Sequence, residues 1–245
     1  MEHKVNRFSE MALAFSGLEK QNEAIDKAAH TLAEAAQRGA LIHVFGVDAR
    51  AADIEGELFF RPGCFACVNP VYDPAFANSH GAYRSELCRP LDGLTARILE
   101  YYEYMEPGEP LLLLALDADS IALRQAAEWA KSHGLAVITI LPGKPSREKT
   151  RSLFDTAIYL GPSYSTLLMT AALDELMARA VALAVISHNS CQNNTGRKKR
   201  EKRPSYRDFW QYGRGYRGLQ LVSNFFGHFI IFRVLSSFRA FWPNV

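Results

Sequence analysis

Long hydrophobic runs are absent from this sequence, and cysteine is scarce. No apolar run in the 245 residues reaches the roughly 18 residues of a membrane span. The N-terminus has no apolar segment that ends in a small-residue cleavage site of the signal-peptide type. Four cysteines (Cys64, Cys67, Cys88 and Cys191) are too few for a disulfide scaffold in a chain of this length. We therefore expect a cytoplasmic protein with reduced thiols and one sizeable core.

Acidic residues are nearly absent from the C-terminal part of the chain. Residues 187–245 contain 11 Lys and Arg against 2 Asp and Glu; of the 28 basic and 26 acidic residues in all, 17 and 24 then remain in residues 1–186. Aromatic residues are interleaved with the basic ones, and alanine becomes rare. We expect a domain over 1–186 and a basic, aromatic tail over 187–245 that is poorly ordered or non-native. The alternatives are a nucleic-acid contact, which is not the expected partner, and a membrane-surface contact.

Apolar segments of strand and helix type alternate before residue 187. The predicted helices are 5–38, 50–61, 91–106, 119–133 and 163–186, the predicted strands are 40–45, 65–68, 111–116, 135–141 and 156–160, and a loop is predicted over 69–90. The strands are almost continuously apolar, as in a sheet buried on both faces. This predicts an α/β fold: a doubly wound, mostly parallel sheet of about five strands with helices on both faces, plus a long N-terminal helix. Ligands of such sheets bind beyond the carboxyl ends of the strands, here at residues 46–50 and 115–120.

These segments resemble those of the SIS (sugar isomerase) domain family over roughly residues 5–186. The resemblance is carried by "LIHVFG", "ELFFRPGCFACVNPV", "PGEPLLLLAL" and "AAEWAKSHGLAVITI", of which the second is the most specific. It is strongest to small single-domain bacterial proteins of this family without an assigned reaction. The resemblance implies a flavodoxin-like sandwich, a phosphosugar or sugar-derived ligand, and a homodimer.

The two turns depart from the family pattern. The first turn of the family reads glycine, small residue, glycine and then Ser or Thr, whereas this chain has Gly46-Val47-Asp48-Ala49-Arg50. The second turn of the family resembles Ser-Asn-Ser-Gly, whereas this chain has Ala115-Leu116-Asp117-Ala118, with only Ser120 nearby. The resemblance therefore assigns Gly46, Val47, Asp48, Arg50, Asp117 and Ser120 to the ligand site, but without the usual hydroxyls.

Carboxylates in these turns oppose a bound phosphate. The amides at a helix N-terminus attract anions, but a like charge at about 4 Å and an effective dielectric of about 20 costs on the order of 4 kcal/mol. Arg50 could offset one such contact. We expect Asp48 and Asp119 to cap the helices that follow them. Two other possibilities remain open: a divalent cation bridging Asp48 and Asp117 to a phosphate, or a ligand that is a neutral or amino-bearing sugar.

Other candidate residues are isolated. His80, in the loop over 69–90, and Glu57, in the helix after the first turn, are the candidate catalytic acid–base residues. Ser163 and Ser165 begin the last predicted helix, where they cap it or offer hydroxyls to a ligand. The "CFAC" pair has no second pair to complete a zinc site, and His43 lies inside an apolar strand as a core histidine. We expect neither a metal nor a cofactor.

Three functions follow from these observations. The first is a SIS-like protein that binds a carbohydrate derivative through altered phosphate turns and has no catalysis of its own. The alternative is a phosphosugar isomerase or lyase that uses His80 or Glu57. The second alternative is a nucleic-acid or membrane-surface binder that acts through the tail.

Overall fold

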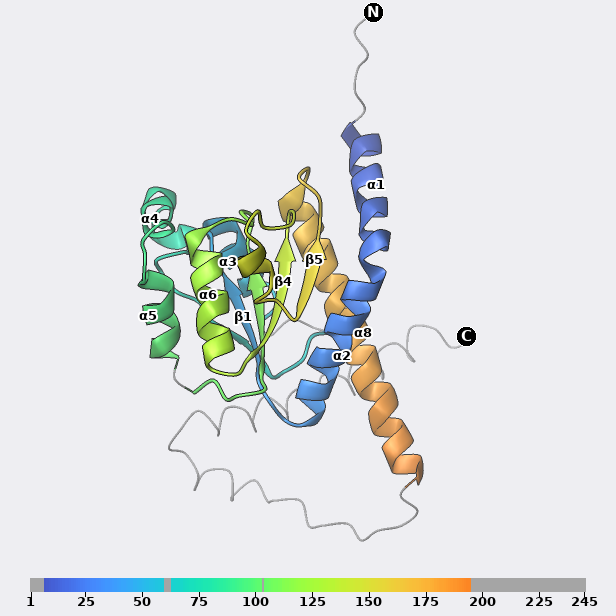
Figure 1. The fold of residues 1–245 in the computed structure, drawn as a ribbon. Helices are drawn as coiled ribbons and strands as arrows, with labels where there is room; N and C mark the ends of the chain where they lie inside the picture. The colour runs from blue at the N-terminus through green and yellow to red at the C-terminus, as the bar shows by residue number, and fades with distance from the viewer. Residues whose placement is uncertain (1–6, 60–62, 103, 195–245) are drawn as a thin grey trace, which may run out of the picture.

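The computed structural model describes residues 7–59, 63–102 and 104–194, in which five strands form one parallel sheet (Figure 1). The strands are β1 (Ile42–Gly46), β2 (Val68–Pro70), β3 (Pro110–Leu114), β4 (Ala136–Leu141) and β5 (Thr156–Tyr159). Their order is β2-β1-β3-β4-β5, and every neighbouring pair is parallel. The predicted doubly wound α/β fold is confirmed, although β2 begins three residues later than the predicted strand over 65–68.

The helices follow the predicted order, but the predicted helix over 91–106 is shorter in the structure, and a short helix over 148–151 was not predicted. They are α1 (Arg7–Leu18), η1 (Glu19–Gln21), α2 (Asn22–Gln37), α3 (Ala49–Gly56), η2 (Asn78–His80), α4 (Ala82–Cys88), α5 (Leu94–Tyr101), α6 (Ile121–Ser132), α7 (Glu148–Arg151) and α8 (Ser165–Asn194). The predicted loop over 69–90 therefore contains two short helices, and the long N-terminal helix tightens into a 3₁₀ turn at η1. In the part of the chain with a described structure, no helix is both long and apolar enough to span a bilayer.

The last helix passes the predicted domain boundary. It ends at Asn194, whereas both the predicted helix and the predicted domain end at residue 186. Most of the predicted tail, residues 195–245, lies outside the described residues.

Alternate residues of the strands face two separate cores. Ile42, Val44, Leu112 and Leu114 pack with α2 and α8 on one face, whereas Phe45, Leu111 and Leu113 pack with α5 and α6 on the other. Figure 1 shows α5 and α6 on one side of the sheet, and α2 and α8 on the other. This is the arrangement expected when successive side chains of a strand point to opposite faces.

The N-terminal helix α1 projects beyond the body of the domain (Figure 1). None of its residues is buried, and Phe8 is 81% exposed. Its continuation α2 packs against α8, where Arg179 donates to Asp26 and Asn22, both at 2.7 Å. The N-terminal segment is thus anchored through α2, whereas α1 exposes apolar side chains.

Gly46 allows α3 to approach the end of β1. A Cβ atom at this position would lie 2.3 Å from both the Ala51 carbonyl carbon and the Ala52 nitrogen, which are backbone atoms that cannot move independently. The Gly46 amide donates to Glu55 of the same helix at 2.6 Å. The position therefore requires glycine because of contact rather than because of its backbone conformation.

We predict that Gly46→Ala destabilises the domain by about 3 kcal/mol or more, since the methyl group overlaps backbone atoms. Urea unfolding measures this change. Gly56→Ala is the matched control because a Cβ there meets nothing within 4 Å; it should be neutral or stabilise by less than about 1 kcal/mol. Equal effects of the two substitutions would contradict the close contact.

Candidate active-site crevice at the sheet switch point

The carboxyl ends of β1 and β3 lie at the point where the strand order reverses. β1 pairs with β2 on one side and with β3 on the other, so the connections that follow β1 and β3 diverge. The Val47 amide donates to the Leu114 carbonyl at 3.0 Å, which continues the pairing to the start of the first turn. Parallel sheets bind ligands in the crevice at such a reversal.

The carboxylate of Asp48 accepts hydrogen bonds from three backbone amides at this edge of the sheet. Its Oδ1 atom accepts hydrogen bonds from the amides of Arg50 at 3.2 Å and Ala51 at 3.0 Å, at the start of α3. Its Oδ2 atom accepts from the amide of Leu116 at 2.7 Å, in the turn after β3. The predicted helix cap at Asp48 is confirmed, and the same carboxylate also joins the two turns.

Burial and hydrogen bonding act on Asp48 in opposite directions. The residue is 6% exposed. Burial raises its pKa above the ordinary value, while the three amides and the Arg89 guanidinium act to lower the pKa. A carboxylate can accept hydrogen bonds from several N–H donors at once. The three backbone amides are therefore already paired with an acidic side chain of the same chain.

The second turn is arranged differently from the prediction. Ser120, rather than Asp119, is the N-cap of α6 and accepts from the Leu123 amide at 3.2 Å. Asp119 instead accepts from both the amide and the hydroxyl of Ser146, each at 2.8 Å, in the loop after β4. The predicted cap at Asp119 is wrong because α6 begins at Ile121. Asp117 is exposed and accepts from the Asp119 amide at 3.0 Å.

The two candidate acid–base residues lie near opposite ends of α3. Glu57 follows the last residue of α3 and is exposed. His80 ends η2, and its side chain lies outside the described part of the structure. Asn78 holds η2 to the start of α3, since its side-chain amide donates to the Ala49 carbonyl at 3.3 Å and to Asp53 at 2.7 Å. The segment with His80 therefore lies beside the helix that follows the crevice.

Ser163 and Ser165 lie at a different part of the sheet edge. They follow β5, which is two strands from β3, or about 10 Å at ordinary strand spacing. Ser165 begins α8, and its hydroxyl donates to the carbonyl of Pro162 at 3.2 Å; Ser163 is exposed. The predicted ligand residues thus form two groups, one at the switch point and one at the edge strand.

Glu55 is a buried acid that the sequence analysis missed. It is fully buried in α3, and its Oε2 atom accepts from the Gly46 amide, whereas its Oε1 atom has no hydrogen-bond partner within the described ranges. Burial raises its pKa well above the ordinary value, against the opposing effect of the Gly46 and Val71 amides. The sequence did contain a signal, because Glu55 lies one helical turn after Ala51 and one turn before Leu58, both on the apolar side of α3.

We predict that Glu55 makes the domain less stable at alkaline pH. A carboxyl group with a raised pKa binds its proton more tightly in the folded state, so stability is greatest at low pH and is lost as the pH rises above the ordinary value of 4.5 toward the folded pKa. Glu55→Gln should flatten this decline in urea unfolding as the pH is raised from about 5. Glu57→Gln, an exposed change beside the same helix, should retain the wild-type slope. An unaltered slope in Glu55→Gln would contradict the assignment.

A second buried polar cluster lies at the amino edge of the sheet. His43 Nε2 lies 2.7 Å from Glu109 Oε2, and His43 Nδ1 lies 3.1 Å from the Asn69 side-chain amide. Glu109 also accepts from the Leu41 amide at 2.8 Å. Burial raises the pKa of Glu109, but the bonds from His43 and the backbone amides outweigh it and leave the pKa lowered. His43 is therefore a hydrogen-bonded core histidine, as predicted, on the edge opposite to the crevice.

A buried cysteine, Cys67, lies directly before β2 at this edge of the sheet. Cys67 is buried, and burial raises the pKa of its thiol to about 12, so it is not a thiolate at neutral pH. In the described ranges, no group of three or more His, Cys, Asp and Glu side chains is arranged to hold a metal ion.

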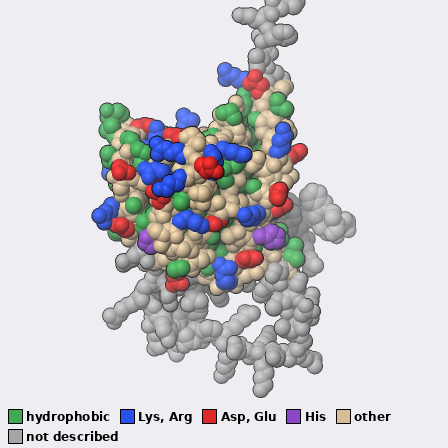
Figure 2. All heavy atoms as spheres, in the orientation of Figure 1, with side chains coloured by type: hydrophobic (Ala, Val, Ile, Leu, Met, Phe, Trp, Pro, Cys, Tyr) green, Lys and Arg blue, Asp and Glu red, His purple; other side chains and the backbone are tan. Residues whose placement is uncertain are grey.

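Charges of both signs are mixed on the face covered by α6 and α7 (Figure 2). Arg124 pairs with Glu128 at 3.0 Å, and Lys131 pairs with Asp155 at 2.8 Å. Exposed pairs of this kind contribute little free energy. This face therefore does not form an anion-binding surface of a single sign.

The fold is an α/β domain with a parallel sheet, and ligands of such sheets bind at the carboxyl ends of the strands, near the switch point. A sequence model of the SIS domain matches residues 8–141, and the chain belongs to this family. It is 27% identical over 155 residues to a UPF0309 protein of Geobacillus kaustophilus, covering 61% of this chain and 59% of that protein. It is 30% identical over 141 residues to a UPF0309 protein of Caldanaerobacter subterraneus, covering 57% and 56%. The matches thus span less than three fifths of these relatives.

Solved structures of the same fold include two phosphoheptose isomerases. The enzyme from Francisella tularensis superposes with a TM-score of 0.54 at 14% identity, covering 72% of this chain and 95% of that one. The enzyme from Neisseria gonorrhoeae gives 0.52 at 14% identity, covering 73% and 95%. At this level of identity the likeness establishes the shared fold.

Proposed function

We propose that this protein binds a carbohydrate derivative at the carboxyl edge of its sheet and does not catalyse a reaction there. Membership of the SIS family and the fold shared with sugar-phosphate isomerases support the ligand class. The observation that carries the rest is the Asp48 carboxylate on the amides of Arg50, Ala51 and Leu116. The chain's own carboxylate takes the place of a ligand phosphate, so the ligand is neutral or amino-bearing at this position.

Electrostatics supports this choice of ligand. A phosphate at about 4 Å from Asp48 would meet a repulsion on the order of 4 kcal/mol at an effective dielectric of about 20. It would also lack the backbone N–H donors whose hydrogen bonds usually offset the free-energy cost of removing water from a phosphate. Such a penalty corresponds to a loss in affinity of about a thousandfold. Asp117, which is exposed beside the crevice, instead favours the hydroxyl or amino groups of a sugar.

The positions of the acidic residues support binding without catalysis. A general acid or base must reach the reacting atoms within hydrogen-bond distance. Glu57 is exposed after the last turn of α3, at the end of the helix remote from Asp48. Glu55 is enclosed beneath Gly46 with no exposed surface. Neither carboxylate opens into the crevice.

We predict that Asp48→Ser creates a phosphate site, because serine keeps the helix cap but frees the Leu116 amide and removes the charge. Calorimetric titration with glucose 6-phosphate, which carries no amine, should show binding to Asp48→Ser that is at least tenfold tighter than binding to the wild type. Asp48→Asn is the matched control: it removes the charge but leaves the space filled, so it should gain less. Wild-type protein that binds the phosphosugar as tightly as Asp48→Ser, without added magnesium, would contradict the proposal.

We also propose that the protein is a homodimer joined through the outer side of α1. Phe8 and Phe15 lie seven residues apart, which is two turns of helix, so both face the same side. They are 81% and 37% exposed, respectively. A helix of this length is marginal by itself in water, and its stability comes from packing. A second copy of the chain would cover these side chains and order the helix.

Sedimentation of the double variant Phe8→Ser, Phe15→Ser tests this interface. The wild type should sediment as a dimer at micromolar concentration, and the variant as a monomer, because each buried phenylalanine contributes about 1.5–3 kcal/mol. Leu87→Ser on α4, which removes another exposed apolar side chain, should leave the dimer intact. A wild-type monomer, or a dimer that persists in the double variant, would rule out this interface.

A further inference from the structure

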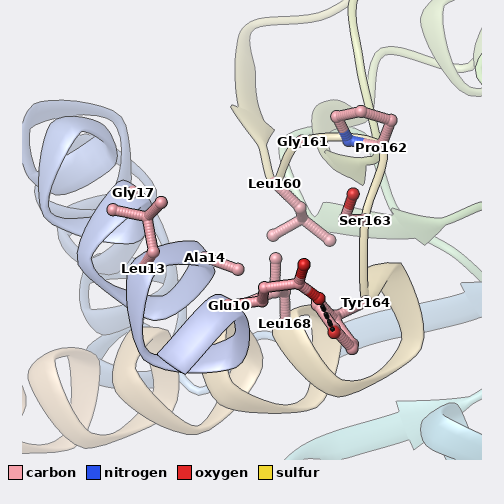
Figure 3. Close-up of a pocket in the computed structure, with 10 residues that line it drawn as sticks. All are labelled: Glu10, Leu13, Ala14, Gly17, Leu160, Gly161, Pro162, Ser163, Tyr164 and Leu168. Carbon is pink, nitrogen blue, oxygen red and sulfur yellow. Dashed lines mark hydrogen bonds between the residues drawn. The ribbon is translucent and has the colours of Figure 1, made fainter. Parts of the chain in front are cut away.

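A groove of about 520 Å³ separates α1 from the turn between β5 and α8 (Figure 3). Its apolar floor includes Ala14 of α1 together with Leu160 and Leu168, which are 5% and 1% exposed. Figure 3 shows Glu10 and Ala14 on the α1 side, and Leu160, Ser163 and Tyr164 across from them. Since Glu10, Ala14 and Gly17 follow helical spacing, they lie on the side of α1 away from Phe8 and Phe15. The groove is therefore separate from the proposed dimer surface.

The polar groups of the groove are held by the backbone around Tyr164. The hydroxyl of Tyr164 donates to Glu10 Oε2 at 3.1 Å, a bond between residues far apart in the sequence. Tyr164 has a φ of 57°, the one positive value of a non-glycine residue in the described ranges. Its carbonyl accepts from the Leu168 amide at 2.9 Å in the first turn of α8. Left-handed backbone at a non-glycine residue is uncommon and clusters at functional sites.

We propose that this groove is a second ligand site, which takes a small hydroxylated molecule bearing a primary amine, such as an amino sugar without phosphate. Glu10 is the charged side chain among the residues that line the groove, and a carboxylate next to an apolar floor favours an ammonium group. The hydroxyls of Ser163 and Tyr164 match sugar hydroxyls, and Leu160 and Leu168 match the carbon face of a sugar ring.

The site is independent of the crevice at Asp48. Its residues come from α1 and from the turn after β5, the edge strand, whereas the crevice lies between β1 and β3. Of the two predicted ligand residues after β5, Ser163 lines the groove. The proposal therefore does not require that the crevice binds anything.

Titration of the full-length protein with glucosamine, N-acetylglucosamine and glucose at neutral pH tests the proposal. Glucosamine should bind at least tenfold more tightly than the other two sugars, because only glucosamine carries an ammonium group. Glu10→Gln should weaken glucosamine binding at least tenfold, and Tyr164→Phe, which keeps the ring, should weaken it severalfold. Glu23→Gln, an exposed change in the first turn of α2, should have no effect.

Three results would overturn the proposal. The first is equal binding of the three sugars, or of none. The second is glucosamine binding that survives Glu10→Gln but is lost in Asp117→Asn, which places the amine in the crevice and leaves the proposed function intact. The third is a dimer that dissociates on Glu10→Gln without any sugar effect, which makes a second copy the occupant of the groove. Failure of the proposed function shows separately, in the phosphosugar titration of the wild type.

Discussion

The bridge made by the Asp48 carboxylate is the interaction on which the carboxyl edge of this sheet depends. One side chain supplies the cap of α3 and a bond to Leu116 after β3, so the turns after two neighbouring strands are joined by a charge that is almost entirely removed from water. Backbone amides at a helix N-terminus can bind an external anion, and here three such amides are paired with a carboxylate of the chain itself. This pairing joins the two turns at the carboxyl edge of the sheet.

The close packing of α3 on β1 explains why a second acid, Glu55, is buried. Because Gly46 lets α3 approach the strand, the side chain of Glu55 reaches back to the Gly46 amide and stays enclosed. Acids thus support both edges of the sheet by different means. Glu109 at the amino edge is satisfied by His43 and backbone amides, whereas Glu55 keeps one oxygen without a partner among the described residues. The fold of the family is present in this chain, and function within one fold depends on the groups at its site.

Local patterns predicted some contacts but not others. The cap at Asp48 follows from an acidic residue before a helix, and the core position of His43 follows from its apolar strand. The cap at Asp119 was predicted by the same rule and is wrong, because α6 begins two residues after the predicted start and Ser120 was equally suited to cap it. Glu55 was missed because its enclosure depends on how closely α3 approaches β1, which brings its carboxylate to the Gly46 amide.

The sequence by itself determined the alternation of strands and helices and the parallel sheet, because continuous apolar runs of this length are buried on both faces only when helices cover them. It also placed carboxylates in the two turns. Only the tertiary structure decided that Asp48 reaches across to Leu116, that Glu55 lies under Gly46, and that Ser163 lines a groove beneath α1. Some of these contacts join segments that are far apart in the sequence, and others depend on how closely a helix approaches a strand. The local pattern of apolar residues predicts neither of these.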